Sequence, residues 1–366
     1  FDLREVPFRV TLCKTRETTY EMIISSHHIL FDGWSMGIIL KEFFEAYETF
    51  CRHIDPPGQA RGKNRFKEFT QWMQKQDTRE QEKFWQEYLE GFNAPGPLPI
   101  KSRSGSKTRT AAGNFRTYAV KGIRNETDQF VKTYKITLAA LFYTSWGLLL
   151  QRYIDGNDVI FGITVSGRSA KIKGIENMVG LFINTLPLRF RANPQEKIAD
   201  VVVRIDQDLK TIGTFEFSSL ADIKKYCPTV MEEELFDSLV AVENYPLDRR
   251  LMLKNRQISV TSYSMSEMTH YNLNAAISTA GDIHMEIIYP AGVFAEDTIA
   301  RLANHFKSIW EDIPGNPGKA VKDIELLSNR EKQQLLIDFN QHGGEYRYPS
   351  DKTLHGLFAE QVKKTP

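Results

Sequence analysis

Hydrophobic and polar residues alternate near the start of the chain and then change to a helical spacing. Residues 8–12 alternate apolar and polar side chains, and residues 20–24 follow a polar turn, which predicts two paired strands. Beyond them the apolar positions recur every three or four residues and form one helical face, made of Met36, Ile39, Leu40, Phe43, Phe44 and Tyr47. Residues 25–33 therefore connect a strand to a helix, and such loops are favoured places for chemistry.

Two aromatic-rich stripes predict two further helices, and a polar segment follows them. The first stripe is Phe66, Phe69, Trp72 and Met73, and the second is Phe84, Trp85, Tyr88 and Leu89. Residues 101–107 contain only Lys, Ser, Arg and Gly and have no hydrophobic periodicity, so they are typical of a linker. We predict a domain boundary near residue 105, and we interpret the basic residues of this segment as a solvated linker face.

The second half of the chain alternates predicted strands and helices. Strands are expected at 114–120, 159–165 and 186–190, helices at 126–134, 137–153, 198–209 and 299–309, and four late strands at 237–243, 257–265, 271–278 and 283–289. This order with late antiparallel strands favours a layered α/β fold. The uncharged window 136–151 is shorter than the roughly 20 apolar residues of a membrane span, so we interpret it as a buried core helix. From residue 323 onward the chain is polar and is expected to be a connector.

Charge and cysteine content exclude several classes of protein. The chain has 47 Lys+Arg and 46 Asp+Glu, a net charge of +1, which gives no overall field to attract nucleic acid or a membrane. Cys13, Cys51 and Cys227 share no short spacing, which argues against a disulfide scaffold or zinc knuckle and fits the cytoplasm. The first residues lack a signal peptide, and because the first residue is Phe, we expect the chain to begin inside a larger protein.

The sequence His27-His28-x-x-x-Asp32-Gly33 carries the clearest chemical signal. A neutral histidine has a pKa of about 6.5, which suits it to accept a proton from an attacking amine or hydroxyl. Asp32 can fix the turn or pair with an arginine, and Gly33 allows a backbone angle or a close approach that a side chain forbids. The helix that begins near Trp34 directs free N–H groups at this turn.

Other interpretations of these residues stay open. The two histidines can be core residues with satisfied hydrogen bonds. His28 and Asp32 can be metal ligands, although a zinc site needs a third ligand and neither a His-Glu-x-x-His sequence nor a cysteine pair supplies one. Ser166-Gly167 lacks the Gly-x-Ser-x-Gly context of a serine nucleophile, and the chain has no glycine-rich phosphate loop.

The histidine motif and the order of further motifs resemble the condensation domains of nonribosomal peptide synthetases. The matching segments are 27–35, 66–72, 84–89, 158–162, 165–168, 179–189, 236–239 and 243–246, and 353–362 resembles the start of an adenylation domain. The two earliest family motifs, which precede the histidine motif, are absent, and residues 215–220 depart from the sixth motif. The resemblance spans nearly the whole chain.

This resemblance implies a fold and a division into domains. The family fold is a layered α/β structure of two chloramphenicol-acetyltransferase-like lobes that form a V with a central tunnel, and here the first lobe is expected to be incomplete. Residues 1–105 would be the remainder of the N-terminal lobe with the histidine motif, 106–322 the C-terminal lobe, and 323–366 a linker and the start of an adenylation domain.

The resemblance also implies an activity and its partners. The expected reaction is amide bond formation between a donor acyl or peptidyl thioester and an acceptor aminoacyl thioester. Both arrive on the 4'-phosphopantetheine arms of an upstream donor and a downstream acceptor peptidyl carrier protein, and the domain itself binds no cofactor or metal. An epimerization domain, a truncated docking module without catalysis and an acyl-coenzyme A transferase are the alternatives.

Specific residues take roles by this resemblance. His28 is the expected catalytic residue, as a general base or by positioning the acceptor amine, inside a cleft that both arms reach. His27, Asp32 and Gly33 support it, and Asp32 is expected to pair with Arg168, whose alternative role is a solvated charge at a strand end. The candidates for lining the tunnel are Trp34, Asn184 and Asn244; packing for Trp34 and turn formation for the asparagines are the alternatives.

Overall fold

The computed structural model describes most of the chain and separates it into two units. The described residues are 2–53, 65–93, 98, 100, 115–121, 124–226, 234–243, 258–263, 269, 271–279, 282–341 and 351–365. The first unit is Phe1–Leu326 and the second is Leu327–Pro366. The predicted boundary near residue 105 lies outside the described residues and stays a prediction.

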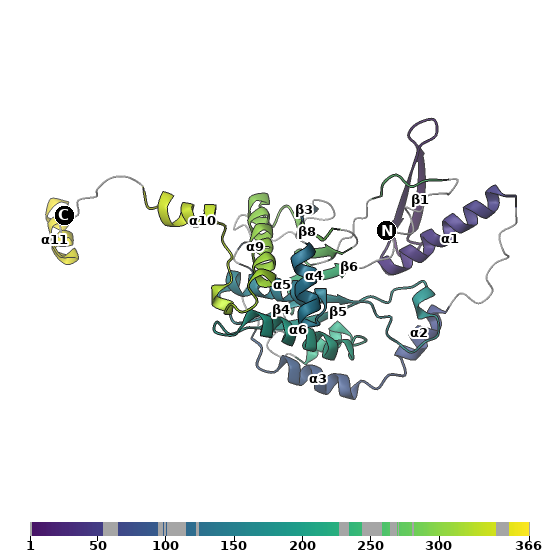
Figure 1. The fold of residues 1–366 in the computed structure, drawn as a ribbon, viewed down its shortest axis with the longest axis horizontal. Coiled ribbons are helices and arrows are strands. Elements are labelled where there is room, and N and C mark those ends of the chain that lie inside the picture. Colours follow the sequence, from purple (N-terminus) through teal and green to yellow (C-terminus); the bar gives the residue numbers. More distant parts are fainter. Residues whose placement is uncertain are drawn as a thin grey trace. The chain divides into compact units, whose positions relative to one another are not determined.

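The chain begins with a hairpin and a long helix, as the hydrophobic pattern predicts (Figure 1). Strand β1 (Phe8–Lys14) pairs antiparallel with β2 (Tyr20–Ser26), and helix α1 (Gly33–Cys51) follows a short turn. Nearly all side chains of β1 are exposed, and β2 has none that is fully buried, so this two-stranded sheet contributes little to the core.

A six-stranded sheet forms the centre of the first unit. Its order is β3 (Phe115–Lys121), β8 (His284–Pro290), β7 (Leu273–Ser278), β6 (Ser238–Glu243), β4 (Asp158–Val165) and β5 (Asn184–Arg191). The expectation of late antiparallel strands is confirmed for β7 with β8, but it is wrong for β6, which runs parallel to both β4 and β7. The connection from β6 to β7 is long enough for the crossover that a parallel pair requires.

Helices α4 (Arg124–Tyr134), α5 (Leu138–Ile154), α6 (Ile198–Gly213) and α9 (Glu296–Gly315) complete the core (Figure 1). Helix α5 packs on α6, α9 and β4, and twelve consecutive residues of it are buried, which confirms the predicted core helix. A side chain at Gly147 would overlap the ring of Phe190 on β5, so the absence of a Cβ lets α5 lie directly on the sheet. Among the described residues, no helix is long and apolar enough to cross a membrane.

Shorter elements join the layers. They are α2 (Phe66–Met73), α3 (Arg79–Leu89) and α7 (Leu220–Lys225), with 3₁₀ turns at Ile175–Asn177 and Val321–Asp323. The predicted strand at 257–265 is wrong for 258–263, which are in no strand. Ile258 and Val260 pack instead against Phe44 of α1, which explains their alternating apolar pattern.

The second unit contains helices where we expected a connector. These are α10 (Asn329–Gln333), a π-helical turn at Gln334–Asp338 and α11 (Leu354–Lys364). A capping box starts α10, since Ser328 accepts from the Glu331 amide and the Glu331 carboxylate accepts from the Ser328 amide.

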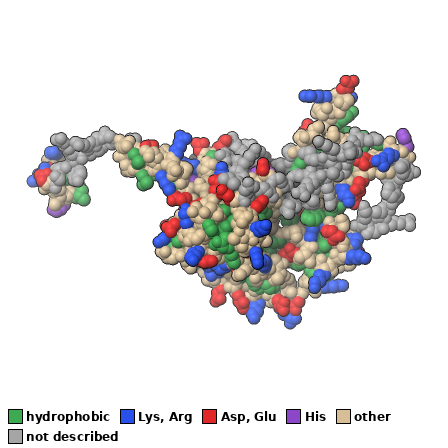
Figure 2. All heavy atoms as spheres, viewed as in Figure 1, with side chains coloured by type: hydrophobic (Ala, Val, Ile, Leu, Met, Phe, Trp, Pro, Cys, Tyr) green, Lys and Arg blue, Asp and Glu red, His purple; other side chains and the backbone are tan. Residues whose placement is uncertain are grey.

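Acidic and basic side chains are interspersed on the face of the molecule seen in Figure 2, in keeping with the balanced charge.

Candidate active site

Backbone hydrogen bonds shape the turn that carries the two histidines. The amide of His27 donates to the carbonyl of Pro7 (2.9 Å), and its Nδ1 atom accepts from the amide of Ile29 (3.1 Å). The amide of Leu30 donates back to the carbonyl of His27 (3.1 Å). His27 therefore holds the turn, and its role as a support for His28 stays a prediction.

His28 lies on this turn and is exposed. We expected it inside a cleft, and the structure differs. Strands β1 and β2, which lead into the turn, form a two-stranded sheet whose side chains are mostly exposed.

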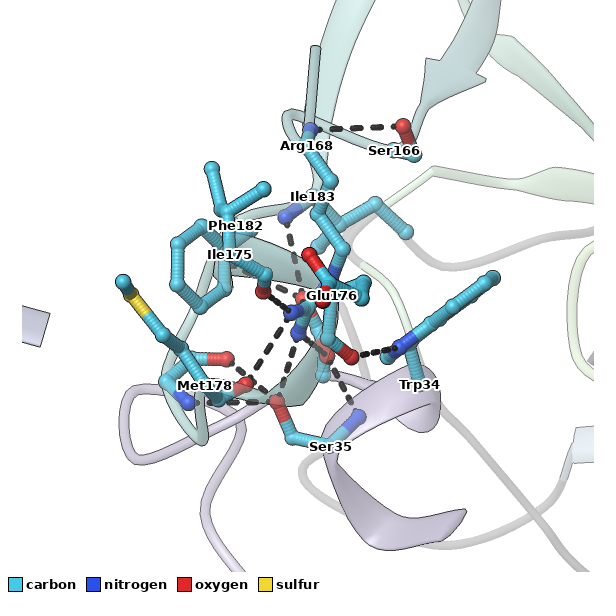
Figure 3. Close-up of polar contacts among 11 residues, drawn as sticks. Trp34, Ser35, Ser166, Arg168, Ile175, Glu176, Met178, Phe182 and Ile183 are labelled. Carbon is cyan, nitrogen blue, oxygen red and sulfur yellow. Dashed lines mark hydrogen bonds and ion pairs between the residues drawn. The ribbon is translucent and has the colours of Figure 1, made fainter. Parts of the chain in front are cut away.

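Asp32 is buried and holds the first turn of α1 to two distant segments. Figure 3 shows Arg168 and Ser35 of this arrangement, with Ile175 and Met178 beside them. The Oδ1 atom of Asp32 accepts from the amide of Ser35 (2.8 Å) and so caps the helix. Its Oδ2 atom accepts from the amides of Phe182 (3.0 Å) and Ile183 (3.3 Å). Arg168 Nη2 lies 3.1 Å from Oδ1, which confirms the predicted ion pair. One carboxylate thus joins the histidine turn to the segments after β4 and before β5.

The side chain of Arg168 is buried among the described residues. Its side chain is 6% exposed, so the alternative of a solvated strand-end charge is wrong. Nη1 donates to the carbonyls of Ile175 (2.7 Å) and Met178 (3.0 Å), and the ring of Phe182 lies 4.1 Å from the guanidinium carbon. Burial lowers the pKa of Arg168, while the charge of Asp32 opposes that shift. The ion pair of Asp32 and Arg168 therefore has a structural role, and we call this pair, with the backbone groups that bind it, the joint.

Two neighbours of Asp32 strengthen the same joint. The hydroxyl of Ser35 donates to the carbonyl of Gly180 (2.9 Å) and accepts from its amide (3.1 Å), and Arg168 Nη2 also donates to it (2.9 Å). Trp34 donates from its indole to the carbonyl of Glu176 (2.9 Å), which favours its packing role over a place in a tunnel. The role of Ser35 was not predicted. Its position three residues after a capping aspartate was a signal for a buried helix start.

The structure tests the roles predicted for Gly33 and Asn184. Gly33 is the first residue of α1 and has no positive φ, so the predicted special backbone angle is wrong there, while the predicted close approach stays a prediction. Gly167 has the positive φ of +62° instead. The amide nitrogen of Asn184 donates to the carbonyls of Glu216 and Ser218, both at 2.8 Å, which favours its structural alternative. Asn244 lies outside the described residues.

An aromatic cluster supports the joint from the side of α2. Phe66 and Phe69 contact the ring of Phe182 at centroid distances of 5.2 Å and 4.6 Å. Gly180 lies directly under Phe66, where a Cβ atom would be 2.0 Å from the ring. The segment that resembles the fourth family motif is thus packed on the segment that holds Asp32. Within the described part of the chain, no group of three or more His, Cys, Asp or Glu side chains could hold a metal ion.

Comparisons with known proteins agree with this arrangement. The family profile described as "Condensation domain" matches residues 1–336. Gramicidin S synthase 2 of Brevibacillus brevis is 34% identical over 371 residues, covering 100% of this chain and 8% of that synthase. Bacitracin synthase 3 of Bacillus licheniformis is 30% identical, with coverage of 100% and 6%. The chain therefore spans less than a tenth of the length of these relatives.

Solved structures share the fold. The X-domain from teicoplanin biosynthesis matches with a TM-score of 0.73 at 21% identity, over 89% of this chain and 76% of that one. The starter condensation domain of rhizomide synthetase matches with a TM-score of 0.69 at 16% identity, over 88% and 73%. The predicted layered α/β fold is confirmed, and the chain belongs to the condensation-domain family of nonribosomal peptide synthetases.

Proposed function

We propose that this domain forms an amide bond between a donor acyl or peptidyl thioester and the amine of an acceptor aminoacyl thioester. The observation that carries the proposal is the buried joint of Asp32 and Arg168, which fixes a turn bearing an exposed imidazole. Family membership and the peptide-synthase names of the relatives support it. Each substrate would be tethered to the 4'-phosphopantetheine arm of a carrier protein.

The reaction asks little of the protein beyond placement and one proton transfer. The acceptor nitrogen attacks the thioester carbonyl, a C–N bond forms, the C–S bond breaks, and the departing thiolate takes up the proton that the amine loses. A neutral His28 can accept that proton and pass it on, an effect typically worth 10²–10⁴-fold in rate. Holding the amine at attack distance contributes in addition, because it removes orientational freedom before the reaction.

The partners and boundaries are part of the same proposal. An upstream donor and a downstream acceptor peptidyl carrier protein would supply the thioesters. Residues 1–105 would belong to the N-terminal lobe, 106–322 to the C-terminal lobe, and 323–366 to the connection with an adenylation domain. The resemblance of residues 353–362 to the start of such a domain supports this order.

The test is His28→Ala in the full-length protein, with loaded donor and acceptor carriers. We expect the rate of product formation to fall by about 10²-fold or more while the melting temperature is unchanged, since His28 is exposed. His355→Ala is the matched control, because His355 is an exposed histidine of the second unit and should leave the rate unchanged.

Two outcomes would contradict the proposal. A wild-type rate in His28→Ala would remove His28 from the reaction. Exchange of the Cα proton of a carrier-bound residue for deuterium, without amide formation, would identify an epimerization domain instead.

A further inference from the structure

The segment between α6 and α7 touches both sides of the joint that holds Asp32, although it departs from the family's sixth motif. Residues Glu216, Phe217 and Ser218 lie here, and Glu216 and Ser218 are buried. Within the described part of the chain, no hydrogen bond or ion pair joins these three residues to Asp32 or Arg168. Their contacts go to the residues that follow Arg168 and Ile183 in the chain.

Glu216 binds the loop that carries Arg168. Its carboxylate accepts hydrogen bonds from the amide of Ser169 (3.0 Å) and from the Ser169 hydroxyl. Glu216 is only 5% exposed, and a buried carboxylate is costly unless such donors satisfy it. Because Ser169 is the next residue after Arg168, these bonds fix the backbone from which the guanidinium extends.

The same segment binds the other side of the joint. Asn184, the first residue of β5, donates to the carbonyls of Glu216 and Ser218 and so connects the segment to the chain just after Ile183. The amides of Phe182 and Ile183 are the ones that hold the second oxygen of Asp32. Residues 216–218 therefore bind both segments that hold the Asp32 carboxylate, namely the loop with Arg168 and the segment with Phe182 and Ile183. We call residues 216–218 the clamp.

The clamp is itself anchored to two helices. Phe217 packs on Trp72 of α2 at a centroid distance of 4.8 Å. The hydroxyl of Ser218 accepts from the indole of Trp85 on α3 (2.8 Å), and that indole is fully buried. Rigid neighbours of this kind are what hold a site at working geometry.

The position of the loop backbone also keeps the Nε atom of Arg168 away from water. This atom is buried and has no hydrogen-bond partner within the part of the chain that the structure describes. The remaining nitrogens are saturated by Asp32, Ser35 and two carbonyls. A shift of the loop would expose Nε to water and loosen the pair with Asp32.

We propose that Glu216 is a positioning residue, which acts through Ser169 to hold Arg168 and thereby Asp32 and the His28 turn. The inference concerns geometry, and its effect on rate rests on the proposed amide-forming function. The two are separable, because the placement of Arg168 can be observed without any substrate.

The first test follows the Arg168 Nε–H proton by NMR in the full-length protein, with the signal assigned by its loss in Arg168→Lys. We expect Glu216→Ala to speed its exchange with water by about tenfold or more, because two hydrogen bonds from Ser169 to a charged group are lost. Glu216→Gln keeps an acceptor oxygen and should restore slow exchange. Glu126→Ala is the matched control, because Glu126 is an exposed carboxylate in the first turn of α4, a helix that packs on α5 and α9.

The second test measures amide formation by the same variants. We expect Glu216→Ala to lower kcat about tenfold with KM for both carriers unchanged, and Glu216→Gln to recover most of it. If Glu216→Ala does not fold, Ser169→Ala removes only the hydroxyl donor and should show the same changes at about threefold. Unchanged exchange and unchanged kcat in these variants would overturn the role of Glu216. A wild-type protein that forms no amide bond would overturn the proposed function alone.

Discussion

Gly167 occupies a place in the backbone that no other residue can take without strain. Its φ is +62°, and a Cβ atom there would lie 1.8 Å from the carbonyl oxygen of Phe182. The backbone of Gly167, in the loop after β4, therefore packs directly against the backbone of Phe182, in the segment before β5. This contact brings Arg168 and the two amides that bind Asp32 to the same point.

We expect Gly167→Ala to lower the free energy of unfolding by at least about 2 kcal/mol, from the left-handed backbone and the overlap with Phe182 together. Gly213→Ala is the matched control, because no atom lies within 4 Å of the added Cβ at the end of α6. That change should leave stability equal or raise it by about 0.5–1 kcal/mol. Urea unfolding monitored by circular dichroism gives both values, and equal stability of the two variants would contradict this account.

Residue-scale prediction from the sequence succeeded where a motif names the partners. Asp32 and Arg168 come from two recognisable motifs, and opposite charges at such positions suggest a pair. Ser35 with Gly180, and Glu216 with Ser169, were not predictable in this way. A small polar side chain can bond a backbone group anywhere in the fold, so its partner is known only once the chain has folded.

At the scale of elements, α5 and α6 are joined by a buried carboxylate at the start of α5. Asp206 of α6 accepts from the amide and the hydroxyl of Thr137, both at 2.7 Å, and Thr137 caps α5. Lys210 lies 2.6 Å from its other oxygen. Burial alone would raise the pKa of Asp206, but the bonds from Lys210 and Thr137 outweigh it and lower the pKa below 3.8.

This shift predicts a pH-dependent contribution of Asp206 to stability. A carboxyl group whose pKa is lowered by folding stabilises the fold fully at pH values above its pKa in the unfolded chain. That stabilisation is lost as the pH falls through its pKa in the folded chain. We expect Asp206→Asn to cost about 1–2 kcal/mol at pH 7 and progressively less below about pH 3.8. Asp200→Asn, an exposed position in the first turn of α6, should show no such trend in urea unfolding across this range. A constant cost of Asp206→Asn from pH 7 to pH 3 would contradict the assignment.

Elements were predictable where a hydrophobic period runs over several turns. Helices α1, α5, α6 and α9 have such a period, and the structure contains all of them. The six residues of α7 are too few to establish one. At 258–263 the apolar residues face α1 and not a sheet, and alternation alone does not distinguish these two surroundings.

At the scale of the whole molecule, the buried core formed by the described residues ends before the second unit begins. Among these residues Val321 and Ile324 are the last buried apolar side chains of the core cluster, and α10, the π-helical turn and α11 bury no residue. Leu354, Phe358 and Val362 instead form an exposed apolar stripe along α11. The stability of the first unit should therefore be set by residues up to Leu326.

We expect truncation after Leu326 to change the free energy of unfolding of the first unit by no more than about 0.5 kcal/mol. Truncation after Asn316 should cost several times more, because it removes the buried side chains of Val321 and Ile324, at roughly 1–3 kcal/mol each. Differential scanning calorimetry of the two truncated chains makes the comparison. A large loss in the longer one would show that residues 327–366 stabilise the first unit.

The order of strands in the central sheet determines when each strand can first pair during synthesis. Strand β3 hydrogen-bonds only to β8 within the described sheet, and β8 is the last of the six strands to be made. At the usual 5–20 residues per second of translation, β8 leaves the ribosome on the order of ten to thirty seconds after β3. Throughout that interval β3 has no hydrogen-bonding partner in this sheet, so its backbone N–H and C=O groups stay open to pairing with another strand.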